Sequence, residues 1–131
     1  MANKPARRKI LVIDDERDLR EVMTELLEKA GYQVICAANG AEGIHMNKQE
    51  NPDSIVLDLC MPGMDGIETL RRIRKQDSEV SVAILTANGS PDTIRDAVGL
   101  NVSEYLSKPF ENSEFVALIG DLLWRQMLVR K

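Results

Sequence analysis

Short runs of hydrophobic residues alternate along the chain with longer segments in which hydrophobic residues recur every three or four positions. Runs such as Ile10-Leu11-Val12-Ile13 are hydrophobic at consecutive positions, which is typical of strands buried on both faces of a parallel sheet. We predict strands at 10–13, 32–37, 54–57, 80–85 and 104–106.

Helical periodicity fills the segments between these strands. One hydrophobic stripe is formed by Leu19, Val22, Met23, Leu26, Leu27 and Ala30, and Gly31 follows as a helix-ending residue. We predict helices at 19–30, 41–48 and 67–73, one that starts at Ser90-Pro91, and one that runs from 112 or 113 toward the C-terminus. Five repeated strand–helix units predict one α/β domain, with a parallel sheet covered by helices on both faces.

Length, charge and composition limit the number of domains, the direct partners and the location that we expect for this protein. The 131 residues suit one domain, which we place at 8–131 after a basic arm at 1–7. The net charge of −4 argues against nucleic acid or an anionic membrane as a direct partner. No hydrophobic run approaches the ~20 residues that span a membrane, and no signal-peptide core follows the basic start. We therefore expect a cytoplasmic protein, with Cys36 and Cys60 as free thiols.

Polar residues follow the predicted strands at the point where each ends. Asp14 and Asp15 follow the first strand, Asp58 the third, Thr86 the fourth and Lys108 the fifth. The carboxyl ends of parallel strands meet at one edge of the sheet, so we expect these five side chains to share one pocket.

This set of side chains suits magnesium-dependent phosphoryl chemistry. Three neighbouring carboxylates repel one another unless a cation lies among them, and an all-oxygen, partly open site favours Mg²⁺. A lysine can pair with an acid or an anionic ligand, and a threonine hydroxyl can donate to a phosphoryl oxygen. A carboxylate beside a metal can itself be the nucleophile and form an aspartyl phosphate.

Four stretches in this order, ILVIDDE, IVLDLCMPGMDG, AILTA and EYLSKPF, carry a family resemblance. Together they resemble the receiver domain of bacterial two-component response regulators, of the chemotaxis-regulator type. The resemblance covers nearly the whole chain. It implies a flavodoxin-like, doubly wound (βα)5 fold with strand order 2-1-3-4-5.

The resemblance also implies a role for each acidic residue. Asp58 would be the phosphoacceptor, with Mg²⁺ as the cofactor. Asp15 would bind the metal directly, Asp14 mostly through water, and the backbone carbonyl of Cys60 would complete the protein's share of the metal ligands. A histidine kinase or phosphotransfer protein would supply the phosphoryl group, and no independent substrate turnover is expected.

A switch is implied in the same way. Thr86 and Lys108 would contact the phosphoryl group, and Tyr105 would turn inward when Thr86 moves. The bond between Lys108 and Pro109 would be cis, which aims the lysine into the pocket. The responding surface would be the fourth helix, the fifth strand and the fifth helix.

The last helix has two hydrophobic sides. Helical geometry places Phe115, Ile119 and Leu122 on the face expected to pack on the sheet. Trp124 and Leu128 lie four residues apart on the opposite side. This spot could hold a second copy or a downstream effector, although scattered exposed hydrophobic residues need no partner.

Three other functions compete with the phosphoacceptor. An aspartate-nucleophile phosphatase needs a second acid two residues after Asp58, where this chain has Cys60. A nucleotide or flavin binder needs a phosphate-cradling glycine motif, which the sequence lacks. A pseudo-receiver that only binds proteins remains the alternative, and the intact set of site residues argues against it.

Overall fold

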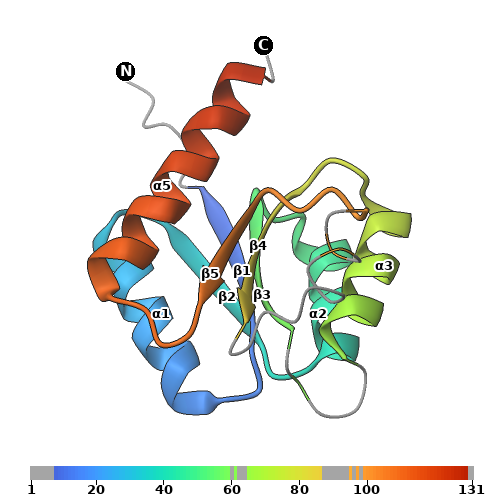
Figure 1. Cartoon of the computed structure of the whole chain (residues 1–131), viewed down its shortest axis with the longest axis horizontal. Helices are drawn as coiled ribbons and strands as arrows, with labels where there is room; N and C mark the ends of the chain where they lie inside the picture. Colours follow the sequence, from blue (N-terminus) through green and yellow to red (C-terminus); the bar gives the residue numbers. More distant parts are fainter. Residues whose placement is uncertain are drawn as a thin grey trace.

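Five parallel strands form the central sheet in the order β2-β1-β3-β4-β5 (Figure 1). The computed structural model describes residues 8–59, 61, 65–86, 95, 97 and 99–129. The strands are β1 (Lys9–Ile13), β2 (Gln33–Ala37), β3 (Ser54–Asp58), β4 (Ser81–Thr86) and β5 (Glu104–Ser107). The predicted strand order is confirmed, and every strand lies within one residue of its predicted bounds.

Helices cover both faces of this sheet, as predicted. Helices α1 (Arg17–Lys29) and α5 (Asn112–Val129) lie on one face, and α2 (Gly40–Glu50) and α3 (Gly66–Gln76) lie on the other (Figure 1). The predicted helix that begins at Ser90-Pro91 lies mostly outside the described residues, and so does the basic arm at 1–7.

The consecutive hydrophobic residues of the strands divide between two cores. Ile10 and Val12 point toward α1 and α5, whereas Leu11 and Ile13 point toward α2 and α3. Successive side chains of a strand leave on opposite faces, so a strand between two helical layers must be hydrophobic at every position. On the α5 side, the predicted sheet-facing residues Phe115 and Ile119 are fully buried.

Three turns among the described residues have a left-handed backbone, at Gly31, Asn51 and Asn101. Gly31 ends α1 with φ +99°, and Asn101 precedes β5 with φ +59°. Glycine and asparagine are the residues that adopt this conformation most readily, and the prediction that Gly31 ends its helix is confirmed. Val22 departs from the predicted stripe of α1, because it lies at the border of the buried face and is 41% exposed.

Among the helices that the structure describes, none is both long and hydrophobic enough to span a bilayer.

Candidate functional site

Three carboxylates meet where β1 and β3 end. Oxygen atoms of Asp14, Asp15 and Asp58 all lie within 4.8 Å of one another. The strand order reverses between β1 and β3, and such a switch point opens a crevice at the carboxyl end of the sheet. Asp14 and Asp58 are buried, whereas Asp15 is exposed at the rim. The neighbouring strands β1 and β3 therefore bring together the three carboxylates of the predicted pocket.

Lys108 directly follows β5, the edge strand of the sheet, and its side chain reaches the acidic cluster. Its Nζ lies 3.1 Å from Oδ2 of Asp58 and 3.2 Å from Oδ2 of Asp14. The Lys108–Pro109 peptide bond is cis, as predicted, and the backbone N–H of Lys108 donates to the carbonyl of Thr86 at 2.8 Å. The ammonium group lies directly between the two buried carboxylates.

Burial and charge act together on these groups. Burial raises the pKa of Asp14, and the negative charge of Asp58 raises it further, against the lowering effect of the Glu16 backbone N–H and of Lys108. Burial alone would lower the pKa of Lys108, but the charges of Asp14 and Asp58 outweigh it and the pKa is raised. The lysine therefore stays protonated, and its single positive charge lies beside a cluster of three carboxylates.

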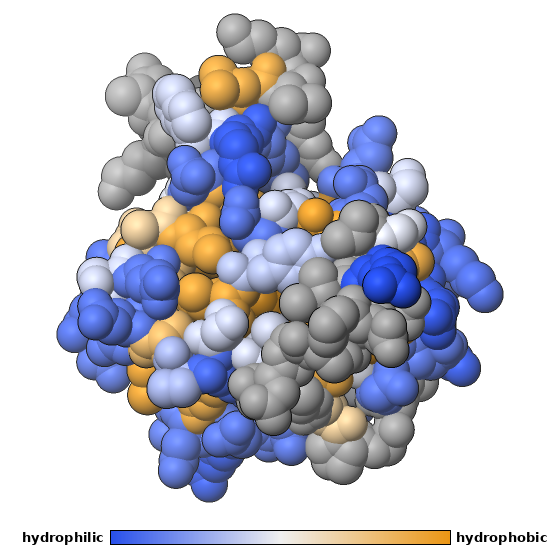
Figure 2. All heavy atoms as spheres, viewed as in Figure 1, coloured by the Kyte–Doolittle hydropathy of each residue, from blue (hydrophilic) through white to orange (hydrophobic). Residues whose placement is uncertain are grey.

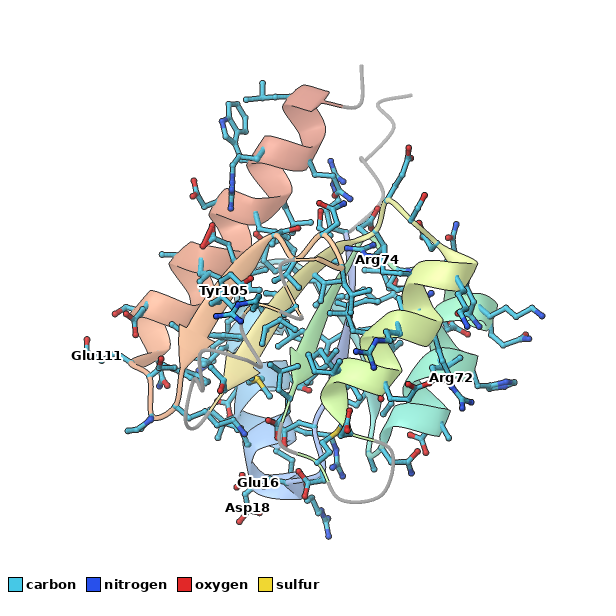
Figure 3. The ribbon with its side chains drawn as sticks, turned by 45° about the vertical axis from the view of Figure 1, so that its right-hand side comes forward. Glu16, Asp18, Arg72, Arg74, Tyr105 and Glu111 are labelled. Atoms are coloured by element: carbon cyan, nitrogen blue, oxygen red, sulfur yellow. The ribbon has the colours of Figure 1, made fainter. Side chains whose placement is uncertain are left out.

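The loop between β1 and α1 and the first turn of α1 each add one residue that was not predicted from the sequence. Glu16 lies near the tip of this loop, and its Oε1 is 3.6 Å from Nζ of Lys108 (Figure 3). Arg20, in the first turns of α1, donates from Nη1 to the backbone carbonyl of Asp14 at 2.7 Å. Glu16 follows the Asp pair directly and could have been noticed, whereas the contact of Arg20 depends on how α1 leaves the loop.

A glycine brings α3 close to the phosphoacceptor candidate. A Cβ at Gly66 would lie 2.3 Å from Cα of Leu59 and 2.8 Å from the carbonyl oxygen of Asp58. Only a residue without a side chain fits there, so the start of α3 packs directly on the end of β3. Asp65, the residue before, caps this helix by accepting a hydrogen bond from the N–H of Glu68 at 2.8 Å.

Two hydroxyl groups near the site are buried without a hydrogen-bond partner among the described residues: those of Thr86 and Tyr105. Thr86 ends β4, and Tyr105 lies opposite Ile84 in β5. Thr86 and Ile84 share one face of β4, and Tyr105 packs in the same core as Ile84. Buried polar groups are almost always paired, so the free Thr86 hydroxyl suits a ligand that brings an acceptor.

The donor set fits Mg²⁺. Among the described residues it consists of the carboxylates of Asp14, Asp15 and Asp58, of which Asp14 and Asp58 are buried, and one lysine leaves part of their negative charge uncompensated. Asp14, Asp15 and Asp58 are the described residues that would hold the ion. The predicted carbonyl ligand of Cys60 lies outside the described residues, and so do the central residues of the loop at 62–64.

Comparisons with known proteins agree with this geometry. The family model of the response regulator receiver domain matches residues 10–120. The chain is similar to sporulation initiation phosphotransferase F of Bacillus subtilis, with 40% identity over 106 residues, which are 81% of this chain and 86% of that protein.

Solved structures agree as well. A receiver domain protein from Clostridium thermocellum has 32% identity and a TM-score of 0.86, over 93% of this chain and 98% of that one. The chemotaxis protein CheY4 of Vibrio cholerae has 28% identity and a TM-score of 0.85, over 89% of this chain and 99% of that one.

Proposed function

This chain belongs to the response regulator receiver domains, and from that premise we propose that Asp58 is the residue that accepts the phosphoryl group. The family is that of phosphoacceptor switches in two-component phosphorelays, and the pseudo-receiver alternative is not favoured. The observation that carries the assignment to Asp58 is its position: it is a buried carboxylate within 4.8 Å of two others and 3.1 Å from the ammonium group of Lys108.

The phosphoryl group comes from a phosphohistidine of the partner protein. An oxygen of Asp58 attacks phosphorus, so that a P–O bond forms while the P–N bond to the donor imidazole breaks. The imidazole keeps the electron pair and takes up a proton. Lys108 already lies beside Asp58 and pairs with the new phosphoryl oxygens, and the unpartnered hydroxyl of Thr86 donates to one of them.

Asp14, Asp15 and Asp58 are the described residues that would hold Mg²⁺, and Cys60 would add its carbonyl. When bound, the ion supplies positive charge that offsets the phosphoryl oxygens during transfer. Asp14 is fixed for this task by Lys108 and by the N–H of Glu16, which donates to its Oδ1 at 2.9 Å. The chain's own chemistry is confined to its aspartyl phosphorylation and dephosphorylation, without turnover of an independent substrate.

The output surface is proposed to include β5 and α5. Tyr105 shares its face of the sheet with Thr86, so a Thr86 that moves toward a phosphoryl group vacates space beside Tyr105. On α5, Trp124 is 57% exposed and Leu128 is 52% exposed. Figure 2 shows hydrophobic atoms at the projecting end of this helix. A second copy or an effector would bind there, and a histidine kinase or phosphotransfer protein would donate at Asp58.

The assignment is tested by mass. The wild type and Asp58→Asn are incubated with a small phosphodonor, in Mg²⁺ and in chelator, and the intact mass of each is measured. We expect one phosphoryl group on the wild type in Mg²⁺, little in chelator, and none on the variant. Asp121→Asn, which changes an aspartate on the exposed side of α5, is the matched control and should be labelled normally.

Phosphorylation that persists in Asp58→Asn would overturn the assignment of the phosphoacceptor. Full labelling in chelator would overturn the role of the metal. The expectations of a cytoplasmic location and of no direct contact with nucleic acid remain predictions from the sequence.

A further inference from the structure

Asp15 differs from the other acids of the cluster in how it is held. The carboxylate of Asp14 is fixed by Lys108 and by the N–H of Glu16, and that of Asp58 is fixed by Lys108. Asp15 is exposed, and its side chain has no hydrogen bond or ion pair with any described residue. Its position therefore depends on the backbone that carries it.

That backbone is held from α1. Nη1 of Arg20 donates to the carbonyl of Asp14 at 2.7 Å, which is a short, charge-assisted hydrogen bond. The carbonyl of Asp14 and the N–H and Cα of Asp15 belong to one planar peptide unit. A guanidinium group that fixes this carbonyl thus fixes the plane from which the Asp15 side chain leaves.

The other anchors of the loop act elsewhere. The N–H of Asp14 donates to the carbonyl of Ala37 at 3.2 Å, and the N–H of Arg20 donates to the carbonyl of Glu16 at 3.0 Å. These bonds hold the two ends of the loop, and the N–H of Glu16, which donates to Oδ1 of Asp14 at 2.9 Å, holds the peptide that follows Asp15. Among the described residues, the side chain of Arg20 is the group that holds the peptide between the two aspartates.

We propose that Arg20 is a positioning residue of the magnesium site, which orients Asp15 through the Asp14 carbonyl without touching the ion. This inference rests on the proposed function, because it takes Asp15 as a metal ligand. Groups that hold metal ligands in place without touching the ion commonly change metal affinity by about 10-fold or more when they are removed. A loop fixed before binding also loses less freedom when the ion arrives.

Arg20→Gln should therefore raise the dissociation constant for Mg²⁺ by roughly 10-fold, measured by calorimetry or by NMR titration. Lysine keeps a positive charge and a hydrogen-bond donor but lacks the planar guanidinium group. Arg20→Lys should therefore recover part of the Mg²⁺ affinity. With a small phosphodonor, the Mg²⁺ concentration at half-maximal labelling should rise, while the maximal rate at saturating Mg²⁺ stays close to that of the wild type. A small donor also excludes any effect of Arg20 on kinase docking.

Arg17→Gln is the matched control. Arg17 lies three residues earlier on α1, its side chain is 81% exposed, and its ion pair is with Glu21 and not with the loop. We expect this variant to bind Mg²⁺ like the wild type.

A measurement without metal separates this inference from the proposed function. In the metal-free protein, amide exchange at Asp15 and Glu16 should be faster in Arg20→Gln than in Arg17→Gln. Equal exchange and equal Mg²⁺ affinity in these two variants would overturn the role of Arg20. If the wild type bound no Mg²⁺, the proposed function would fail, while the exchange comparison would still decide whether Arg20 orders the loop. If Arg20→Gln does not fold, Arg20→Lys supplies the same comparisons.

Discussion

At the scale of single residues, the hydroxyl of Tyr105 gives a prediction that depends on pH. Burial raises the pKa of Tyr105, and its hydroxyl has no partner among the described residues. The pKa of tyrosine in the unfolded chain is about 10. While the pH is below that value, a raised pKa in the folded state does not lower the free energy of unfolding. Stability is lost as the pH rises from there toward the folded pKa. Absorbance titration should show a late-ionising tyrosine that is absent in Tyr105→Phe.

Tyr32→Phe is the control for this titration, since the chain has two tyrosines. It should keep the late-ionising group. At neutral pH, Tyr105→Phe removes a buried, unpaired hydroxyl, so the free energy of unfolding should be unchanged or higher by up to about 1 kcal/mol. A clear loss of stability in Tyr105→Phe would mean that the hydroxyl is paired in solution.

At the scale of elements, the contact between β3 and α3 depends on one glycine. In Gly66→Ala, the added Cβ would meet backbone atoms of Leu59 and Asp58, which cannot move aside as a flexible side chain would. We expect a loss of about 1–3 kcal/mol in the free energy of unfolding, the usual cost of overpacking. Because the clash lies beside Asp58, labelling by a small phosphodonor should slow as well.

Gly120→Ala provides the matched comparison within α5. Its added Cβ would meet only the hydroxyl of Tyr32, at an ordinary 3.7 Å. An alanine in a helix interior is favoured over glycine, so this variant should gain about 0.5–1 kcal/mol. Urea denaturation of both variants measures the difference, and equal effects would contradict the packing argument.

At the scale of the whole molecule, α5 extends past the sheet (Figure 1). It carries two exposed hydrophobic residues, Trp124 and Leu128. A tryptophan at the centre of an interface often contributes about 2 kcal/mol or more, which corresponds to a roughly 30-fold change in dissociation constant. We expect self-association in sedimentation that strengthens with beryllofluoride, a phosphoryl mimic, and that is weakened by this factor in Trp124→Ala.

Val22→Ala is the control, because Val22 is an exposed hydrophobic residue on α1 with 41% exposure. It should associate like the wild type. If the wild type stays monomeric at high concentration with beryllofluoride, self-association through α5 is excluded. The surface on α5 would then bind a different protein.

Much of this molecule was determined by the order of its residues. Consecutive hydrophobic residues in the strands identified a sheet buried on both faces, and the periodicity of the helices supplied its two covering layers. The polar residues Asp14, Asp58, Thr86 and Lys108 were found from their positions after the strands. They could be found because parallel strands bring their carboxyl ends to one edge whatever the details of packing.

Tertiary structure decided which of these residues touch. Side-chain directions at neighbouring strands place Lys108 between Asp14 and Asp58. They also leave the hydroxyls of Thr86 and Tyr105 without a partner among the described residues. The contact of Arg20 with the Asp14 carbonyl depends on the angle at which α1 leaves its loop. Local patterns record burial and periodicity along one segment, whereas a hydrogen bond between two segments is fixed only when the whole core sets their distance and orientation.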